Sequence, residues 1–148
     1  MKKYILIAAV ASIFALNSCG DNNGLFSHLA SFVSAENVAM TTTTELIKNR
    51  PDCVAVLKKV AKRFRDTYDE NIFYKSDLLS DLEQLVIKSN VTSKAEILVA
   101  IDIIVNKCFD EEEIDVARYK QSLIEIVNGI EAAIRYYEMT TTGVVTTK

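Results

Sequence analysis

The sequence predicts an all-α protein, a small bundle of about five helices, and three observations lead to this fold class. Apolar residues recur at intervals of three and four in several long segments, which is the spacing of one face of an α-helix. The 148 residues include only four Gly and one Pro, whereas a sandwich or barrel of short strands needs many turn residues. A content of 49% hydrophobic and 25% charged residues is typical of a globular chain, and the length suffices for one domain.

The first 18 residues have the layout of a signal peptide. Lys2 and Lys3 give a basic start, an almost uninterrupted apolar run extends from Tyr4 to Leu16, and small residues precede Cys19. The run is too short for a membrane-spanning helix, which needs about 20 apolar residues. It also lacks the polar face of an amphipathic helix in a folded domain. We therefore expect residues 1–18 to direct export.

The segment Leu16-Asn17-Ser18-Cys19 resembles the lipobox of bacterial lipoprotein precursors, although Asn17 is larger than the residues usual at its position. This resemblance implies cleavage before Cys19, acylation of Cys19, and a lipid-anchored location in the bacterial cell envelope. Two or more acyl chains hold a protein on a membrane far more durably than one chain. Gly20 agrees with an outer-membrane location if the host has two membranes. The alternative is plain secretion, with Cys19 as a spare thiol or as a disulfide partner.

A polar spacer and two helical candidates follow the leader. Residues 19–24 are expected to form a lipid-anchored spacer. Residues 25–33 carry an apolar helical stripe that packs on the domain or lies on the bilayer surface. The segment 34–49 is a weaker helical candidate, because the four β-branched threonines at 41–44 are poor helix formers and predict a break there. The stripe consists of Leu25, Phe26, Leu29, Phe32 and Val33.

A helix from about 51 to 70 is predicted by Pro51 at its first position, an acid in its first turn and a continuous apolar face. The next residues, 71–75, form a connection whose large side chains are expected to enter the core. A short Leu-rich helix then begins with Ser76 as its N-cap. The side chains expected in the core are Ile72, Phe73 and Tyr74.

The helix over 94–108 is predicted to be the centre of the bundle. Ser93 and Glu96 are spaced as a capping box, in which the Ser hydroxyl and the Glu carboxylate satisfy free backbone N–H groups reciprocally. Apolar residues cover most of the circumference of this helix, as in a helix that neighbours surround on several sides.

A long C-terminal helix over about 112–138 closes the predicted fold. Its apolar stripe has near-regular 3/4 spacing. Gly129 disfavours the helix by about 1 kcal/mol relative to Ala and is expected to permit a close crossing. Residues 140–148 are Thr-rich and expected to be a flexible tail, so a single helical domain spans 25–139. The stripe consists of Val116, Tyr119, Leu123, Ile126, Val127, Ile130, Ala133, Ile134 and Tyr137.

Two further cysteines, Cys53 and Cys108, are a candidate disulfide if Cys19 is acylated and the compartment is oxidising. A bridge between them would close a loop of roughly 55 residues and add about 4 kcal/mol to the free energy of unfolding in the chain-entropy model. The alternative is two separate buried thiols that act as small hydrophobic residues. The sequence leaves both possibilities open.

The charge pattern argues against nucleic acid as a partner. The chain has 17 basic and 20 acidic residues, and removal of Lys2 and Lys3 leaves 15 against 20, a net charge of −5. Nucleic-acid binding needs a basic surface instead. The acidic run at 110–115 has no Gly of a calcium loop and suits the first turn of a helix. The basic run at 58–65 is a solvated face, or a surface for anionic headgroups or an acidic partner, or a partner of the acidic run.

The sequence contains no arrangement typical of a catalytic, cofactor-binding or metal site. His28, the only histidine, lies near the predicted anchor, and neither a phosphate-binding loop nor a zinc-ligand spacing is present. We therefore expect a protein that is not an enzyme and that carries no cofactor. An enzyme whose carboxylates come together from separate helices is a third hypothesis.

The predicted bundle also has a limited resemblance to short, uncharacterised helical proteins of phage genomes, carried by Asn49-Arg50-Pro51 before a helix and by residues 123–130 in a long closing helix. This resemblance implies no active site. The leader and the helical domain together favour a lipid-anchored interaction module that binds an envelope protein or itself, as in superinfection exclusion. The alternative is a carrier of small ligands. Its apolar pocket would be lined by Phe64, Tyr68, Ile101, Ile104 and Ile130.

Overall fold

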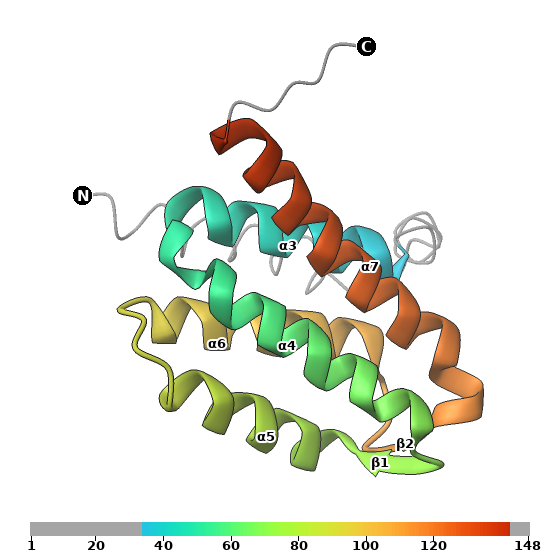
Figure 1. The fold of residues 1–148 in the computed structure, drawn as a ribbon. Helices are drawn as coiled ribbons and strands as arrows, with labels where there is room; N and C mark the ends of the chain where they lie inside the picture. Colours follow the sequence, from blue (N-terminus) through green and yellow to red (C-terminus); the bar gives the residue numbers. More distant parts are fainter. Residues whose placement is uncertain (1–33, 143–148) are drawn as a thin grey trace, which may run out of the picture. The chain divides into compact units, whose positions relative to one another are not determined.

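The computed structural model describes residues 34–142, and it confirms the predicted fold class, a small all-α bundle (Figure 1). Two 3-10 turns, Pro51–Cys53 and Thr67–Asp69, flank the second helix of this part. The predicted segments 1–18, 19–24 and 25–33 lie outside the described residues. The five helices are α3 (Ala35–Asn49), α4 (Val54–Asp66), α5 (Lys75–Ile87), α6 (Lys94–Cys108) and α7 (Val116–Thr141).

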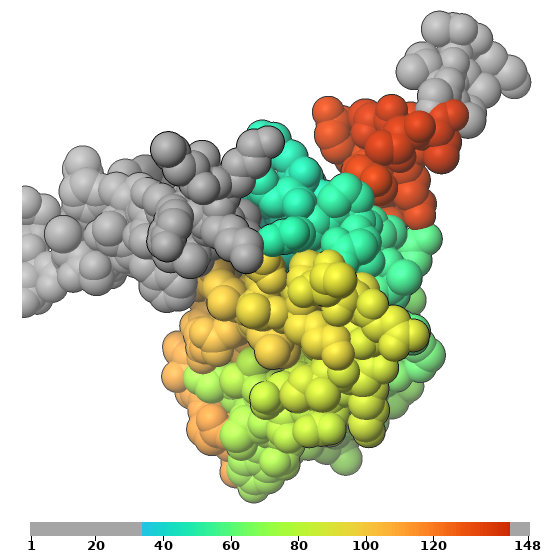
Figure 2. Space-filling view, turned by 90° about the vertical axis from the view of Figure 1, so that its left-hand side faces the viewer, coloured from blue at the N-terminus to red at the C-terminus, as the bar shows by residue number. Residues whose placement is uncertain are grey.

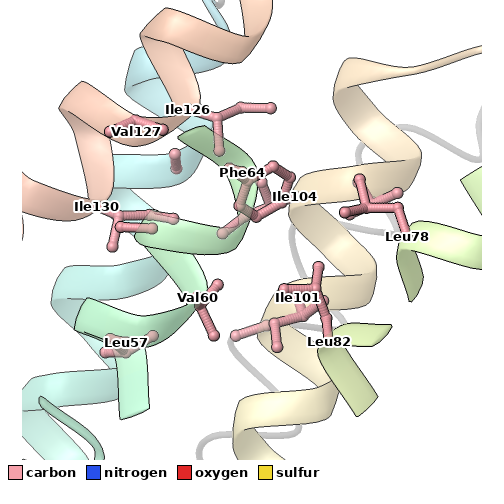
Figure 3. Packing of buried hydrophobic residues seen from close by; sticks show 14 of the residues in the cluster. Leu57, Val60, Phe64, Leu78, Leu82, Ile101, Ile104, Ile126, Val127 and Ile130 are labelled. Atoms are coloured by element: carbon pink, nitrogen blue, oxygen red, sulfur yellow. The ribbon is translucent and has the colours of Figure 1, made fainter. Parts of the chain in front are cut away.

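The helices are arranged around one apolar core. Helix α7 packs against α3 and α4, while α6 packs between α3 and α5. Figure 3 shows side chains of α4, α5, α6 and α7 meeting in this core, with Phe64 of α4 beside Ile104 of α6. Both side chains are at most 2% exposed. Burial of such side chains is the main source of stability, at roughly 1.5–3 kcal/mol each.

The two ends of the bundle differ, and Figure 1 shows them on its right and left sides. The right side, which we call the ribbon end, carries a two-stranded sheet, the start of α3 and the end of α6. The left side, here the open end, carries the turn at 49–54, the loop at 88–93 and the last turns of α7. Two contacts join the elements of the open end: Arg50 pairs with Glu96 at 2.8 Å, and Lys58 pairs with Glu138 at 2.6 Å.

Helices α3 and α7 run side by side in the same direction and approach most closely at Gly129. A Cβ atom added at Gly129 would lie 2.8 Å from the backbone nitrogen of Met40 and 2.9 Å from Cβ of Ala39, and closer still to the carbonyl oxygen of Glu36. No larger residue fits there without moving α3. The close crossing predicted at Gly129 is therefore confirmed.

The ribbon is an element that sequence reasoning missed. Strands β1 (Ile72–Tyr74) and β2 (Glu113–Asp115) pair antiparallel, with Phe73 opposite Ile114. Because side chains alternate between the faces of a strand, only Phe73 of the three expected residues enters the core, at 6% exposure, and Ile72 and Tyr74 are about half exposed. The expectation that all three are buried was wrong.

The threonine run at 41–44 does not break the second predicted helix. Helix α3 is continuous from Ala35 to Asn49, and the side chain of Ser34 caps it by accepting a hydrogen bond from the backbone N–H of Asn37. Thr43 is fully buried against the core. Packing of α3 along α7 outweighs the low helix propensity of threonine, because tertiary contacts supply most of the stability of helices in proteins.

Two predicted helix caps, at Ser76 and Ser93, were wrong. Helix α5 begins at Lys75, so Ser76 lies inside its first turn, where its backbone N–H donates to the Glu112 carboxylate. Helix α6 has the predicted bounds, but Ser93 makes no capping bond and instead donates its hydroxyl to Asp52. The carboxylate of Glu96 pairs with an arginine of the open end.

Helix α7 begins and ends later than predicted. Residues 113–115 form β2, and the side chain of Asp115 caps the helix by accepting a hydrogen bond from the backbone N–H of Ala117. The helix continues to Thr141, so the first residues of the expected tail are helical; positions 143–148 lie outside the described residues. Its predicted apolar stripe is confirmed: every member from Val116 to Ile134 is buried, and Tyr137 is half-buried.

We expect Gly129→Ala to destabilise the fold by about 2 kcal/mol, because overpacking of a tight contact outweighs the roughly 1 kcal/mol that Ala gains in helix propensity. Urea unfolding followed by circular dichroism measures the change. Asn128→Ala, at the exposed neighbouring position, is the matched control and should leave the stability unchanged or slightly raised. A Gly129→Ala protein as stable as the control would contradict the close crossing.

Candidate interaction surface

Two residues singled out in the sequence, Cys19 and His28, lie outside the described residues. The structure therefore gives no geometry for the predicted lipidation site or for the only histidine. The remaining predicted positions, from Cys53 to the acidic run, lie within the bundle, and their surroundings are described below.

The two cysteines of the bundle are free thiols at opposite ends of α6, so the candidate bridge is not formed. Asp52, next to Cys53, contacts Ser93 at the start of α6, whereas Cys108 is the last residue of that helix. A helix of this length spans about 20 Å, and a disulfide requires Cα atoms within about 7 Å. The alternative of two separate thiols agrees with the structure.

Burial keeps both thiols protonated. It raises the pKa of Cys53 from 9.0 to about 12, with a smaller contribution from the neighbouring charge of Asp52. Burial likewise raises the pKa of Cys108 to about 12, with a smaller contribution from Glu125. A reactive cysteine needs a lowered pKa, because the thiolate is the nucleophile. Neither thiol has the environment of a catalytic nucleophile.

The acidic run at 110–115 is engaged in holding the ribbon end together. Glu111 pairs with Arg118 at 2.7 Å, and Glu112 accepts the backbone N–H of Ser76 at 2.8 Å. Asp110 accepts a hydrogen bond from the hydroxyl of Tyr119, which lowers the pKa of the Asp110 carboxyl. These carboxylates fix the start of α7 to the rest of the bundle. They do not pair with the basic run of α4.

The basic run at 58–65 is largely neutralised by other carboxylates. Two of its cations bind α7, through Lys58 to Glu138 and Arg65 to Glu131. Two others pair closer along the chain: Lys62 with Asp66, and Arg63 with Asp81 and Glu70. Lys59, exposed on α4, makes no ion pair within residues 34–142. The face is thus less available to anionic headgroups than the sequence suggests.

The last turns of α7, residues 135–142 and here called the α7 tip, extend past the bundle. Figure 2 shows this tip in red, standing above the surface formed by α3 and α6. None of its residues is buried, and two large apolar side chains on it are exposed, Tyr136 at 65% and Met139 at 60%. These are the most exposed large apolar side chains of the described part.

The exposure of Tyr136 follows from the crossing at Gly129. Seven residues advance a helix by about 20° less than two full turns, so Tyr136 leaves α7 in nearly the direction in which Gly129 faces α3. The two helices have diverged at that level (Figure 1), and α3 no longer covers the side chain. Sequence reasoning missed this surface, although Tyr136 and Met139 lie outside the predicted stripe and so signalled apolar residues without a place in the core.

A surface depression lies at the open end, between α4 and the loop that joins α5 to α6. It has a volume of about 510 Å³ and is formed by the first turns of α4 and the loop that joins α5 to α6. The carboxylate of Asp52 connects the two by accepting hydrogen bonds from Thr92 and Ser93. The residues that form it are Asp52, Ala55, Val56, Lys59, Lys88, Ser89, Asn90, Val91 and Thr92.

The five residues that the carrier hypothesis places around a pocket contribute to the core instead. Phe64, Ile101, Ile104 and Ile130 are at most 3% exposed and belong to one continuous cluster of packed side chains (Figure 3). Tyr68 is half-buried, and its hydroxyl lies 3.4 Å from the carbonyl oxygen of Leu123. These side chains pack against the rest of the cluster.

Neither a metal centre nor a membrane span is found in the part of the chain that the structure describes. Among residues 34–142, no three His, Cys, Asp or Glu side chains are placed to hold a metal ion. None of the helices in the same range is both long enough and apolar enough to cross a bilayer. Comparison of the chain with known protein families, curated proteins and solved structures finds no match.

We expect Cys53 and Cys108 to react with a thiol reagent at pH 8 about a hundredfold more slowly in the folded protein than in denaturant, because their raised pKa values keep them protonated. The mass of the protein should not change on reduction. The raised pKa values also imply that the contribution of the two thiols to stability is full below pH 9 and decreases as the pH rises from about 9 to about 12, because unfolding then releases thiol protons. Labelling of the folded chain as fast as that of the denatured chain would contradict the burial of the two thiols.

Proposed function

We propose that the protein is a lipid-anchored component of the bacterial cell envelope and acts as a non-catalytic interaction module. The observation that carries the proposal is the α7 tip, which presents Tyr136 and Met139 to solvent beyond the bundle. The leader and the lipobox-like motif ending at Cys19 support the location. The partner is another envelope protein, and a version encoded by a mobile element would block a receptor or an injection channel.

An exposed helix end with large apolar side chains suits protein recognition. Tyr and Met are enriched at the centres of protein interfaces, where they bury much surface with few polar atoms to satisfy. An ion pair of Glu138 with α4 holds the tip itself, and a second pair, of Glu131 with α4, holds the helix just before the tip. A fixed helix loses little conformational entropy when it binds, which favours affinity.

The alternative, a carrier of small apolar ligands, has less support. Ligand pockets commonly enclose 300 Å³ or more of space lined by apolar side chains. The side chains assigned to such a pocket, Phe64, Ile101 and Ile104 among them, are packed in the core. The depression at the open end has Asp52, Lys59 and Lys88 in its lining, which does not suit a wholly apolar ligand.

We expect the protein extracted from host membranes to have the mass of residues 19–148 with two or three acyl chains. Cys19→Ser should abolish the acylation, because the thiol is the acceptor, and move the protein to the soluble fraction after export. Mass spectrometry and membrane fractionation measure both effects. Cys108→Ser is the matched control and should remain membrane-bound. An unacylated wild-type mass would remove the anchor from the proposal.

We expect a photo-crosslinking amino acid at position 139 to form a covalent adduct with one envelope protein in host cells. The same amino acid at position 72, which is 52% exposed at the ribbon end, is the control and should give no such adduct. Tyr136→Lys should reduce the adduct at 139 at least about tenfold without changing stability, because apolar anchors dominate interface energies. Equal adducts from both positions, or none from either, would contradict the proposed surface.

A further inference from the structure

The pairing of cations on α4 has one exception, and it faces the depression at the open end. Four of the five cations of α4 form ion pairs with carboxylates at 3.4 Å or less: Lys58, Lys62, Arg63 and Arg65. Lys59 has no ion pair within residues 34–142 and lines the depression. Lys88, across the depression on the α5–α6 loop, is likewise exposed and without an ion pair in the described part of the chain. Two lysines without ion pairs in the described part therefore line one depression.

A third hydrogen-bond donor lies in the same loop. The side-chain amide of Asn90 is exposed and makes no hydrogen bond to any residue between 34 and 142. The only acid in the lining, Asp52, is turned to the loop, where its Oδ2 accepts hydrogen bonds from Thr92 and from the hydroxyl of Ser93 at 3.2 Å. The lining thus offers donors without partners in residues 34–142, while one oxygen of its only carboxylate is engaged by the loop.

The lining also has an apolar part. Ala55 and Val56 come from the first turns of α4, and Val91 comes from the loop; Val56 is 3% exposed and Val91 is half-buried. An occupant that contacts these residues would bury apolar surface while its charged groups stay at the rim. A volume of about 510 Å³ matches a few amino-acid side chains.

We propose that this depression binds an acidic segment of the partner protein, with partner carboxylates between Lys59 and Lys88 and a neighbouring apolar side chain on Val56 and Val91. Ammonium and amide N–H groups donate to carboxylate oxygens, and hydrogen bonds to ionised groups are stronger than neutral ones. The site is exposed, so each charge contact is weak and sensitive to salt. The proposal rests on the proposed function, because the segment belongs to the protein that the α7 tip contacts.

The arrangement of α4 explains how one partner reaches both surfaces. Lys58 points to Glu138 of the α7 tip, and the next residue, Lys59, borders the depression. The first turns of α4 therefore separate two surfaces at the same end of the bundle. A partner that covers this end contacts an apolar projection on one side and a cationic hollow on the other.

Binding of the acetylated and amidated peptide Gly-Glu-Leu-Glu-Gly to the mature chain with Cys19→Ser tests the inference. This form keeps every residue of the bundle and needs no membrane. We expect amide NMR shifts at residues 88–92 that saturate at millimolar peptide and that weaken at high salt. Lys59→Gln and Lys88→Gln should each weaken binding about three- to fivefold.

Lys62→Gln removes the same charge from the same helix and is the matched control, which should bind like the unsubstituted chain. The peptide with Gln in place of Glu should not bind. Equal binding of both peptides, shifts confined to residues outside 52–59 and 88–92, or no binding at all would overturn the inference. Adducts from position 139 that persist in any of these cases would show that the α7 tip functions without the depression, so the two proposals fail separately.

Discussion

The close crossing of α3 and α7 at Gly129 is the constraint on which the rest of the structure depends. Because a glycine lets the two backbones meet, α7 lies deep against α3 and its apolar stripe reaches the core from Val116 to Ile134. The same crossing gives α7 its angle, and the helix leaves the bundle before it ends at Thr141 (Figure 1). One small residue thus permits the close packing of α7, the longest helix among residues 34–142.

The interactions around this crossing divide between stability and orientation. The buried cluster supplies the free energy of folding, since ion pairs as exposed as Lys58–Glu138 and Arg65–Glu131 contribute about 0–1 kcal/mol each. Those pairs nevertheless fix the direction of α4 relative to α7, because they hold two exposed helix faces in one register. At the ribbon end, Phe73, Phe109 and Tyr119 pack edge to face and close the core beneath the strands.

Sequence reasoning succeeded where a long periodic pattern decides the structure and failed where a distant partner decides it. The stripe of α7 follows from its spacing, the bounds of α6 from its local sequence, and the close crossing from a glycine inside a helix. The cap at Ser93 was wrong because its hydroxyl binds Asp52, far along the chain, and the cap at Ser76 was wrong because α5 begins one residue earlier. Three-residue strands are too short for a periodic signal. The sequence cannot show that Lys59 lacks an ion pair within residues 34–142, because the carboxylates that pair with its neighbours lie on other parts of the fold.

The contrast between the two ends of the bundle is the reason that the proposed interaction is assigned to the open end. At the ribbon end, carboxylates of residues 110–115 accept hydrogen bonds from backbone and side-chain donors of the same bundle. These carboxylates therefore contribute to the fold. At the open end Tyr136, Met139, Lys59 and Lys88 have no such use. The chain enters α3 at the ribbon end, and α3 then covers about 20 Å before its last residues reach the open end. The groups without partners in residues 34–142 therefore lie at the end of the bundle opposite to the start of α3, and the proposed interaction uses this end.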